Sequence, residues 1–217
     1  MSLREGTHEL DLFPMTGPRT NACFTVALLL FLSALPFPAA AQDARPQVLI
    51  RTSLGNIRVE IDSAAAPITA ANFLRYVDEG AFEGASFYRT VTLDNQPDND
   101  VKIEVIQGGL LATEGGRERM HEPINHETTD QTGLLHKDGA LSMARAQPGT
   151  ATSEIFICIG DQPELDFGGT RNPDGQGFAA FGRVVDGMDV VRWIQQQPAD
   201  GQRLTPPIEI INITRVE

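Results

Sequence analysis

The stretch SFYRTVTLDNQPDNDVKIEVIQGG, residues 86–109, decides the fold because it places two polar side chains on neighbouring apolar strands. Residues 87–91 are aromatic or β-branched apart from one arginine, a composition typical of a pleated strand. Residues 102–107 follow a period of two up to a pair of glycines, which predicts a second strand. The polar residues between the two runs predict a turn. We therefore expect Arg89 and Gln107 to lie on adjacent strands.

The rest of the chain predicts more strands and two helices. Apolar residues three or four apart predict one helix that Thr69 can cap and that stops at Gly80, and a second helix over 186–195. The chain has no alternation of strands and helices, and a closed antiparallel barrel is compatible with this pattern, since closure removes exposed sheet edges. Further strands are expected at 48–52 and 57–61 as a hairpin, and at 140–144, 155–159, 178–185 and 208–216.

A polar, irregular segment at residues 111–137 contains three histidines and raises the question of a metal site. Its run HEPINH is one residue too long for the zinc-protease pattern, and Pro123 disfavours the continuous helix that the pattern needs. Surface-loop histidines are the favoured interpretation, and a secreted metal-dependent hydrolase is the alternative that these residues keep open. The histidines are His121, His126 and His136.

Two further segments resemble catalytic or binding motifs only weakly. Ser142 and Ser153 lie in no G-x-S-x-G elbow, and no histidine with a partnering carboxylate stands out, so roles in turns and caps are expected. Residues 161–177 are rich in Gly, Asp, Asn and Pro. They lack the acidic residue that ends a calcium loop, and an ordinary insertion is the better interpretation.

The N-terminal residues 1–41 have the pattern of a secretory signal peptide. Residues 22–35 form an uncharged apolar run, and small residues follow at 39–41. The run is shorter than the ~20 apolar residues that span a bilayer. We therefore predict cleavage after Ala41 and export, with no stable membrane insertion. Acidic residues before Met15 fit a leader poorly, which favours Met15 as the true start.

Composition limits the classes of partner and the source of stability. The chain has 29 acidic and 17 basic residues, a formal net charge of −12, which disfavours nucleic acid and anionic membranes as partners. Removal of the leader leaves Cys158 as the one cysteine, so no intramolecular disulfide can form. Because Cys158 lies in an apolar, strand-like run, we expect it to be buried and unreactive.

Four motifs together resemble the cyclophilin family of peptidyl-prolyl cis-trans isomerases. They occur in the family's order, and the resemblance covers residues 47–217. It implies a closed eight-stranded antiparallel barrel whose ends are covered by two α-helices, with the site on an outer face. The expected isomerase domain spans residues 42–217. The motifs are FYRTV at 87–91, IQGG at 106–109, LSMARAQPGTATSEIFIC at 141–158 and FAAFGRV at 178–184.

The resemblance also implies the residues of the site. Arg89 is the arginine of the FYR motif and the expected catalytic donor, and Gln107 is the expected glutamine that positions this arginine or the substrate carbonyl. Phe156 would form the floor of the proline pocket. The implied substrate-binding residues are Val105, Ala144, Arg145, Ala146, Glu154, Leu165 and Phe178, of which Ala144, Arg145 and Ala146 would hold the preceding peptide backbone.

Several positions depart from the family pattern at the expected pocket. A shallower pocket and weak binding of cyclosporin follow from these changes. Glu104 and Val105 replace a phenylalanine and a methionine, Glu154 a glutamine, Arg145 an asparagine, Phe178 a histidine, and Glu164 a tryptophan that family members use to bind cyclosporin.

Rotation about an X-Pro bond breaks no covalent bond, so it needs no nucleophile, metal or cofactor, only a surface that binds the twisted amide better than the planar one. We expect an exported, periplasmic and monomeric isomerase that acts on proline-containing peptides and on unfolded or partly folded exported proteins. The alternative, favoured by the substitutions in the pocket, is a proline-peptide binding module or holdase with little or no turnover.

Overall fold

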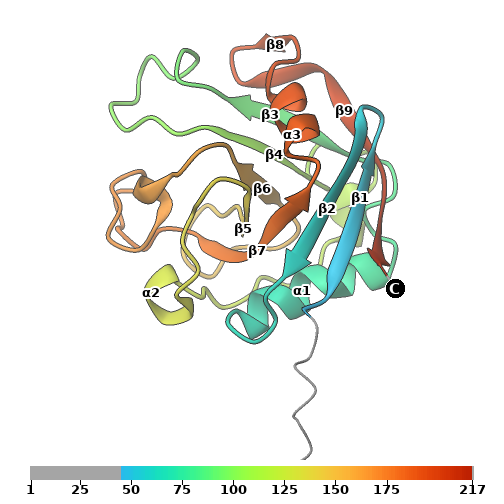
Figure 1. Cartoon of the computed structure of the whole chain (residues 1–217), viewed down its shortest axis with the longest axis horizontal. Helices are drawn as coiled ribbons and strands as arrows, with labels where there is room; N and C mark the ends of the chain where they lie inside the picture. The colour runs from blue at the N-terminus through green and yellow to red at the C-terminus, as the bar shows by residue number, and fades with distance from the viewer. Residues whose placement is uncertain (1–44, 217) are drawn as a thin grey trace, which may run out of the picture. The chain divides into compact units, whose positions relative to one another are not determined.

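The computed structural model of the protein describes residues 45–216, so the predicted leader and its start at Met15 lie outside the described residues. The described chain forms one antiparallel sheet with short helices around it (Figure 1). The strands are β1 (Gln47–Thr52), β2 (Gly55–Ile61), β3 (Ala85–Val91), β4 (Val105–Gly109), β5 (Ala140–Met143), β6 (Ile155–Cys158), β7 (Ala179–Asp186), β8 (Ala199–Asp200) and β9 (Arg203–Val216). The α-helices are α1 (Pro67–Asp78), α2 (Thr129–Thr132) and α3 (Met188–Gln195), and two 3₁₀ turns are η1 (Gly116–Arg119) and η2 (Pro163–Leu165).

The sheet closes into a barrel of eight strands. Neighbouring strands follow the order β1, β2, β7, β5, β6, β4, β3, β9, and β9 pairs again with β1. All of these pairings are antiparallel, and the two-residue strand β8 adds only to β9. The predicted closed antiparallel barrel is therefore confirmed, and every described sheet edge in the barrel is paired.

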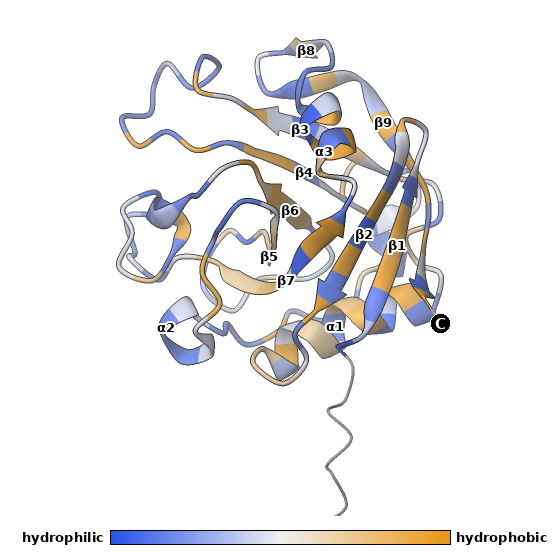
Figure 2. Cartoon of the chain, in the orientation of Figure 1, coloured by the Kyte–Doolittle hydropathy of each residue, from blue (hydrophilic) through white to orange (hydrophobic). Residues whose placement is uncertain are grey.

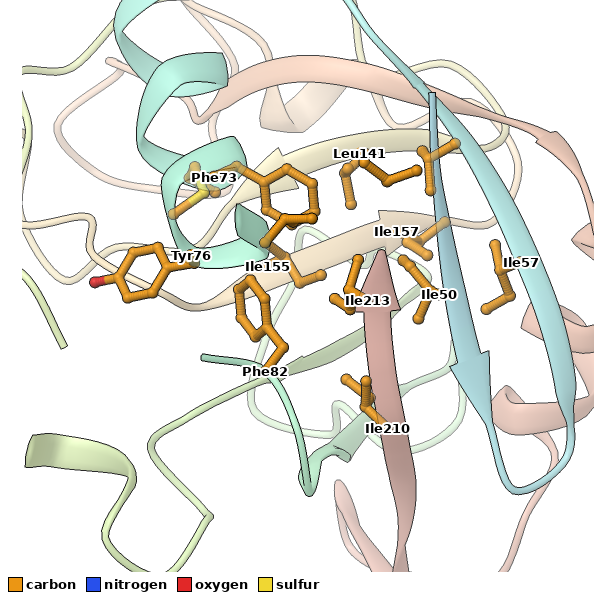
Figure 3. Packing of buried hydrophobic residues seen from close by; sticks show 14 of the residues in the cluster. Ile50, Ile57, Phe73, Tyr76, Phe82, Leu141, Ile155, Ile157, Ile210 and Ile213 are labelled. Atoms are coloured by element: carbon orange, nitrogen blue, oxygen red, sulfur yellow. The ribbon is translucent and has the colours of Figure 1, made fainter. Parts of the chain in front are cut away.

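Apolar side chains fill the barrel, and helices cover both of its ends. Figure 3 shows Ile50, Leu141 and Ile157 pointing from different strands into one interior, where each is fully buried. The aromatic rings of Phe73 on α1 and Phe181 on β7 pack 5.2 Å apart. In Figure 1, α1 lies at one end of the barrel and α3 at the other. Figure 2 shows hydrophobic and hydrophilic residues both present along β1 and β2, as their alternating burial requires.

Helix α1 starts two residues before the predicted cap, because Pro67 occupies its first turn, where a missing N–H costs nothing. Thr69 is therefore not the cap. Its backbone N–H and its hydroxyl both donate to Glu127 Oε2 at 2.7 Å, and the N–H of Ile68 donates to Glu127 Oε1 at 3.1 Å. A carboxylate from a distant loop thus satisfies the free N–H groups at the helix start. The predicted stop at Gly80, which has a φ of +65°, is confirmed.

The predicted strand over 102–107 begins only at Val105. Before Val105, the side chain of Gln96 takes the place of a strand partner. Gln96 Nε2 donates to the Ile103 carbonyl at 2.8 Å, and the Ile103 N–H donates to Gln96 Oε1 at 3.3 Å. The second predicted helix starts at Met188, because β7 continues to Asp186. Sequence periodicity did not predict α2, because a single helical turn is too short to show a period. Its capping box, Thr128 with Gln131, lies within the segment that we expected to be irregular.

Burial of Cys158 is complete, as expected from its apolar surroundings in β6. Desolvation raises the pKa of its thiol well above the ordinary value, which disfavours the reactive thiolate. None of the helices in the described part of the chain combines the length and the apolar character needed to span a bilayer.

Candidate active site

A cavity of about 330 Å³ lies on the outer face of the barrel. Its floor follows from the alternation of strand side chains. On β6, Ile155 and Ile157 point into the barrel, whereas Phe156 and Cys158 belong to a second, smaller apolar cluster outside it. The cavity is lined by Arg89, Asn99, Ile103, Val105, Gln107, Ala144, Arg145, Phe156, Leu165, Arg171, Asn172 and Phe178.

Arg89 and Gln107 are directly opposite each other on β3 and β4. Arg89 Nη1 donates to Gln107 Oε1 at 2.7 Å. On the other edge of the guanidinium, Nε and Nη2 donate to Gln202 Oε1 at 2.9 and 2.6 Å. These contacts use three of the five N–H donors of an arginine, so donors remain for a substrate. Burial lowers the pKa of Arg89, yet a guanidinium stays protonated at neutral pH.

A chain of hydrogen bonds continues behind Gln107. Its Nε2 donates to the Tyr88 hydroxyl at 2.9 Å, and that hydroxyl donates to Glu154 Oε2 at 2.7 Å. Burial, followed by the nearby charge of Glu154, raises the pKa of Tyr88 far above its ordinary value. Glu154 was predicted to bind substrate, but it is buried and does not line the cavity. Glu154 instead anchors the network that orients Gln107, and a Cβ at Gly109 would collide with its carboxylate.

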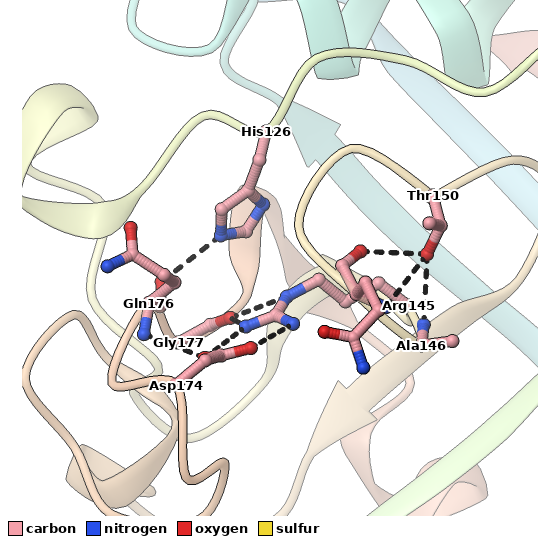
Figure 4. Close-up of polar contacts among 8 residues, drawn as sticks. His126, Arg145, Ala146, Thr150, Asp174, Gln176 and Gly177 are labelled. Atoms are coloured by element: carbon pink, nitrogen blue, oxygen red, sulfur yellow. Dashed lines mark hydrogen bonds and ion pairs between the residues drawn. The ribbon is translucent and has the colours of Figure 1, made fainter.

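Arg145 lines the cavity with its guanidinium already occupied. Figure 4 shows it held by Asp174 and by the Gly177 carbonyl: Nη1 and Nη2 lie 2.8 and 2.9 Å from the Asp174 oxygens, and Nε lies 2.9 Å from Gly177 O. The hydrogen bonds from Arg145 lower the pKa of Asp174 to about 2. The guanidinium also lies 5.2 Å from the ring centre of Phe178. Arg145 therefore uses its guanidinium to fix the loop before β7, and the contact of residues 144–146 with a peptide backbone stays a prediction.

Phe156 is held between two rings. His136 stacks on it with ring centres 5.8 Å apart and planes 12° apart, and Phe178 meets it edge-on at 5.3 Å. His136 Nδ1 lies 2.7 Å from Asp166 Oδ1, and His136 Nε2 lies 2.9 Å from Ser142 Oγ. The sequence indicated no histidine with a partnering carboxylate, and this prediction is wrong. Ser142 is fully buried, so this triad orders the floor and is closed to a substrate.

The predicted site residues thus come together only in part. Eight of the ten line the one cavity, whereas Glu154 is buried behind it and Ala146 does not line it. The Ala146 N–H donates to Thr150 Oγ1 at 3.1 Å within its own exposed loop (Figure 4). The eight are Arg89, Val105, Gln107, Ala144, Arg145, Phe156, Leu165 and Phe178.

The sequence matches the profile of the family described as cyclophilin type peptidyl-prolyl cis-trans isomerase/CLD over residues 47–215. The chain belongs to this family. It is 34% identical over 172 residues to peptidyl-prolyl cis-trans isomerase A of Dickeya dadantii, covering 78% of this chain and 82% of the relative. It is 36% identical over 145 residues to isomerase B of Escherichia coli, covering 66% and 80%.

Solved structures agree with the fold of this cyclophilin. A cyclophilin type isomerase of Cryptosporidium parvum superposes with a TM-score of 0.62 at 22% identity, covering 80% of this chain and 98% of that one. A second crystal structure of the same protein, determined in the presence of the dipeptide Ala-Pro, superposes with a TM-score of 0.63.

Glu104 and Glu164 stand at positions where the family has pocket residues, but neither lines the cavity of this isomerase. Glu104 stands where the family has a pocket phenylalanine, but the residue that lines the cavity is Ile103. Ile103 lies two positions before Val105, just ahead of β4, and both residues line the cavity. Glu104 Oε1 instead lies 3.3 Å from Gln195 Nε2. Glu164 lies outside the lining residues, where it accepts hydrogen bonds from Thr170.

Arg171 and Gln202 contribute to the site, although no sequence pattern indicated them. Each is on a loop far along the chain from its partner, 75 residues from Gln96 for Arg171 and 113 residues from Arg89 for Gln202. No periodicity or motif of this isomerase links such positions. The one signal for Arg171 was its place as the single cation in an insertion otherwise rich in acids, residues 161–177.

The three loop histidines of the cyclophilin do not come together. His121 Nε2 bonds Glu79 Oε2 at 2.7 Å, His126 Nε2 lies 3.1 Å from the Gln176 carbonyl, and His136 belongs to the buried triad. Over residues 45–216, no group of three or more His, Cys, Asp or Glu side chains is placed to hold a metal ion.

Proposed function

We propose that this isomerase accelerates X-Pro rotation by presenting Arg89 to the prolyl nitrogen as the amide twists. When resonance is lost, that nitrogen regains a lone pair that accepts a hydrogen bond. Arg89 lines the cavity and uses three of its five N–H donors on Gln107 and Gln202. The observation that carries the proposal is the fixation of one guanidinium by two amide oxygens, those of Gln107 and Gln202, beside an apolar floor.

The hydrogen bond from Arg89 to the prolyl nitrogen can account for only part of the rate acceleration. Rotation about a peptide bond has a barrier of ~18–20 kcal/mol. A hydrogen bond from a charged group contributes ~1.5–3 kcal/mol, which corresponds to ~10- to 150-fold in rate if the bond forms only in the twisted state. Pre-orientation of Arg89 helps because the free energy of ordering its side chain is spent during folding. The shape of the pocket around the proline must supply the rest.

The proposed ligand is a proline-containing peptide with its ring on Phe156. Phe156 is buried between His136 and Phe178, which leaves a rigid apolar surface of the kind that a pyrrolidine ring fits. The relative's structure determined with Ala-Pro supports this ligand class for the present chain. The substrate backbone would follow Ala144, on the wall beside the floor.

We also propose that the substrates are unfolded or partly folded exported proteins and that the enzyme acts in the periplasm as a monomer. The predicted leader at residues 1–41 supports export. Intact mass of the protein from fractionated cells tests this: a mature chain that starts at Gln42 in the periplasmic fraction is expected, and a retained leader in the cytoplasm would contradict it. Size-exclusion chromatography with light scattering tests the monomer.

The mechanism is tested by the cis-to-trans rate of a short Ala-Pro peptide. We expect the parent to accelerate the rate and Arg89→Ala to lose at least tenfold in kcat/KM, with Arg89→Lys intermediate because an ammonium lacks the planar fork. Arg192→Ala, an exposed arginine on α3, is the matched control. Equal rates for parent and Arg89→Ala would discard the mechanism. No acceleration by a folded parent would indicate a binding module.

A further inference from the structure

Arg171 is a second guanidinium at the cavity, and it has no carboxylate partner. Its Nη1 donates to Gln96 Oε1 at 2.8 Å and to the Val101 carbonyl. Across residues 45–216, neither Arg171 nor Arg89 takes part in an ion pair. Burial lowers the pKa of Arg171, and the positive charge of Arg89 lowers it further. Two like charges therefore face one cavity without a counter-charge.

The missing counter-charge does not reflect a shortage of acids. The loop that carries Arg171, residues 161–177, contains four carboxylates, and each is bound to another group. The cavity itself is lined by no aspartate or glutamate among the described residues, and its third arginine, Arg145, is neutralised by Asp174. In that loop Asp161 pairs with Lys137, Glu164 accepts from Thr170, Asp166 from His136 and Asp174 from Arg145.

We propose that Arg171, together with Arg89, makes this isomerase select X-Pro segments with an aspartate or glutamate next to the proline. The inference rests on the proposed use of this cavity for X-Pro isomerisation. With a proline on Phe156, its neighbouring side chain enters the same cavity that Arg171 lines. A planar guanidinium matches a carboxylate with two parallel hydrogen bonds. Asn172, which also lines the cavity, has a buried Nδ2 without a hydrogen-bond partner in the described structure.

The charge of the whole protein sharpens this inference. At a formal net charge of −12, the surface repels an acidic peptide at long range. Such repulsion is screened beyond about 8 Å at physiological salt, whereas a partly buried contact is screened much less. We therefore expect the preference for an acidic residue to be retained, or to increase, as salt is added. A preference caused by long-range attraction would instead decrease.

The test compares kcat/KM for matched peptides measured by NMR exchange at about 0.15 M salt. One pair is Ala-Glu-Pro-Phe and Ala-Gln-Pro-Phe, and a second pair places Glu or Gln after the proline. For the parent we expect a Glu-to-Gln ratio of about ten in at least one pair, equivalent to ~1.4 kcal/mol. Arg171→Gln should bring the ratio below about two, and Arg171→Lys should partly retain it. The ratio cancels any loss of folded enzyme.

Arg192→Gln is the matched control, because Arg192 is an exposed arginine on α3 that pairs with Asp138 in the turn before β5. Arg192→Gln removes one positive charge, as Arg171→Gln does, and should keep the parent's ratio. A ratio near one for the parent in both pairs, or a parental ratio in Arg171→Gln, overturns the inference. If the folded parent accelerates neither peptide, turnover itself fails, and the Kd ratio of the same peptide pairs then decides the charge preference.

Discussion

At the scale of single residues, Gln202 holds one edge of the Arg89 guanidinium by accepting from both Nε and Nη2. We predict that Gln202→Ala lowers kcat/KM on a neutral Ala-Pro peptide by about three- to tenfold, the value of one ordinary hydrogen bond, because Arg89 gains rotamer freedom. The measurement is the cis-to-trans rate, with unfolding by urea as a check on stability.

Rescue separates positioning from mere packing at Gln202. Gln202→Glu keeps the accepting oxygen and should retain most of the activity. Gln197→Ala removes a half-buried glutamine just after α3 and should not change the activity. Equal activity of Gln202→Ala and the parent would show that Gln107 alone suffices to orient the arginine.

The residues also show what the sequence reveals of a site. Arg89 and Gln107 were predictable because each belongs to a short motif on a strand, and strand pairing brings them together. Phe156 was predicted from the resemblance to the family, and alternation along β6 places it outside the barrel, in the lining of the cavity. The prediction that Glu154 binds substrate did not anticipate its burial, because a motif gives the position of a residue in the sequence but not how deeply its side chain is buried. Arg171 was missed because its place depends on how a long loop folds back on Gln96.

At the scale of elements, Glu127 fixes the start of α1. Its carboxylate accepts from two backbone N–H groups and from the Thr69 hydroxyl, while its side chain is buried. A negative charge at this position also complements the helix dipole. We predict that Glu127→Gln lowers the free energy of unfolding by about 1–2 kcal/mol, as for the loss of a strong cap. Glu122→Gln, an exposed neighbour on the same loop, should have no effect.

Urea denaturation with a constant m-value measures this difference. Glu127→Gln should leave the cis-to-trans rate of the folded enzyme unchanged, because α1 covers the barrel end and does not line the cavity. Equal losses in Glu127→Gln and Glu122→Gln would mean that the cap contributes nothing. Periodicity predicted the strands and one hairpin, whereas the closure and the eight strands of the barrel followed from the resemblance to the family. The cap was not predicted, because it joins residues 58 apart and no local sequence pattern indicates it.

At the scale of the whole molecule, surface carboxylates tie distant segments together and make the fold sensitive to acid. Hydrogen bonds from Arg145 lower the pKa of Asp174 from its ordinary 3.8 to about 2. Arg215 likewise lowers the pKa of Asp78, and Arg45 that of Glu60. A carboxyl with a lowered pKa stabilises the fold fully above its unfolded value, and this stabilisation is lost as the pH falls through the folded value. The parent's Tm should therefore fall between about pH 4 and pH 2.

Asp174→Asn isolates one of these pairs. At neutral pH the variant leaves the guanidinium of Arg145, whose side chain is 1% exposed, without its counter-charge, so its Tm should be clearly below that of the parent. As the pH falls from about 4 to 2 the parent's Asp174 is protonated as well, and the two Tm values should converge. Asp98→Asn changes an exposed aspartate that makes no ion pair with the described residues. Its Tm should equal that of the parent at every pH. A gap between Asp174→Asn and the parent that stays constant down to pH 2 would show that the pair stabilises through packing and not through charge.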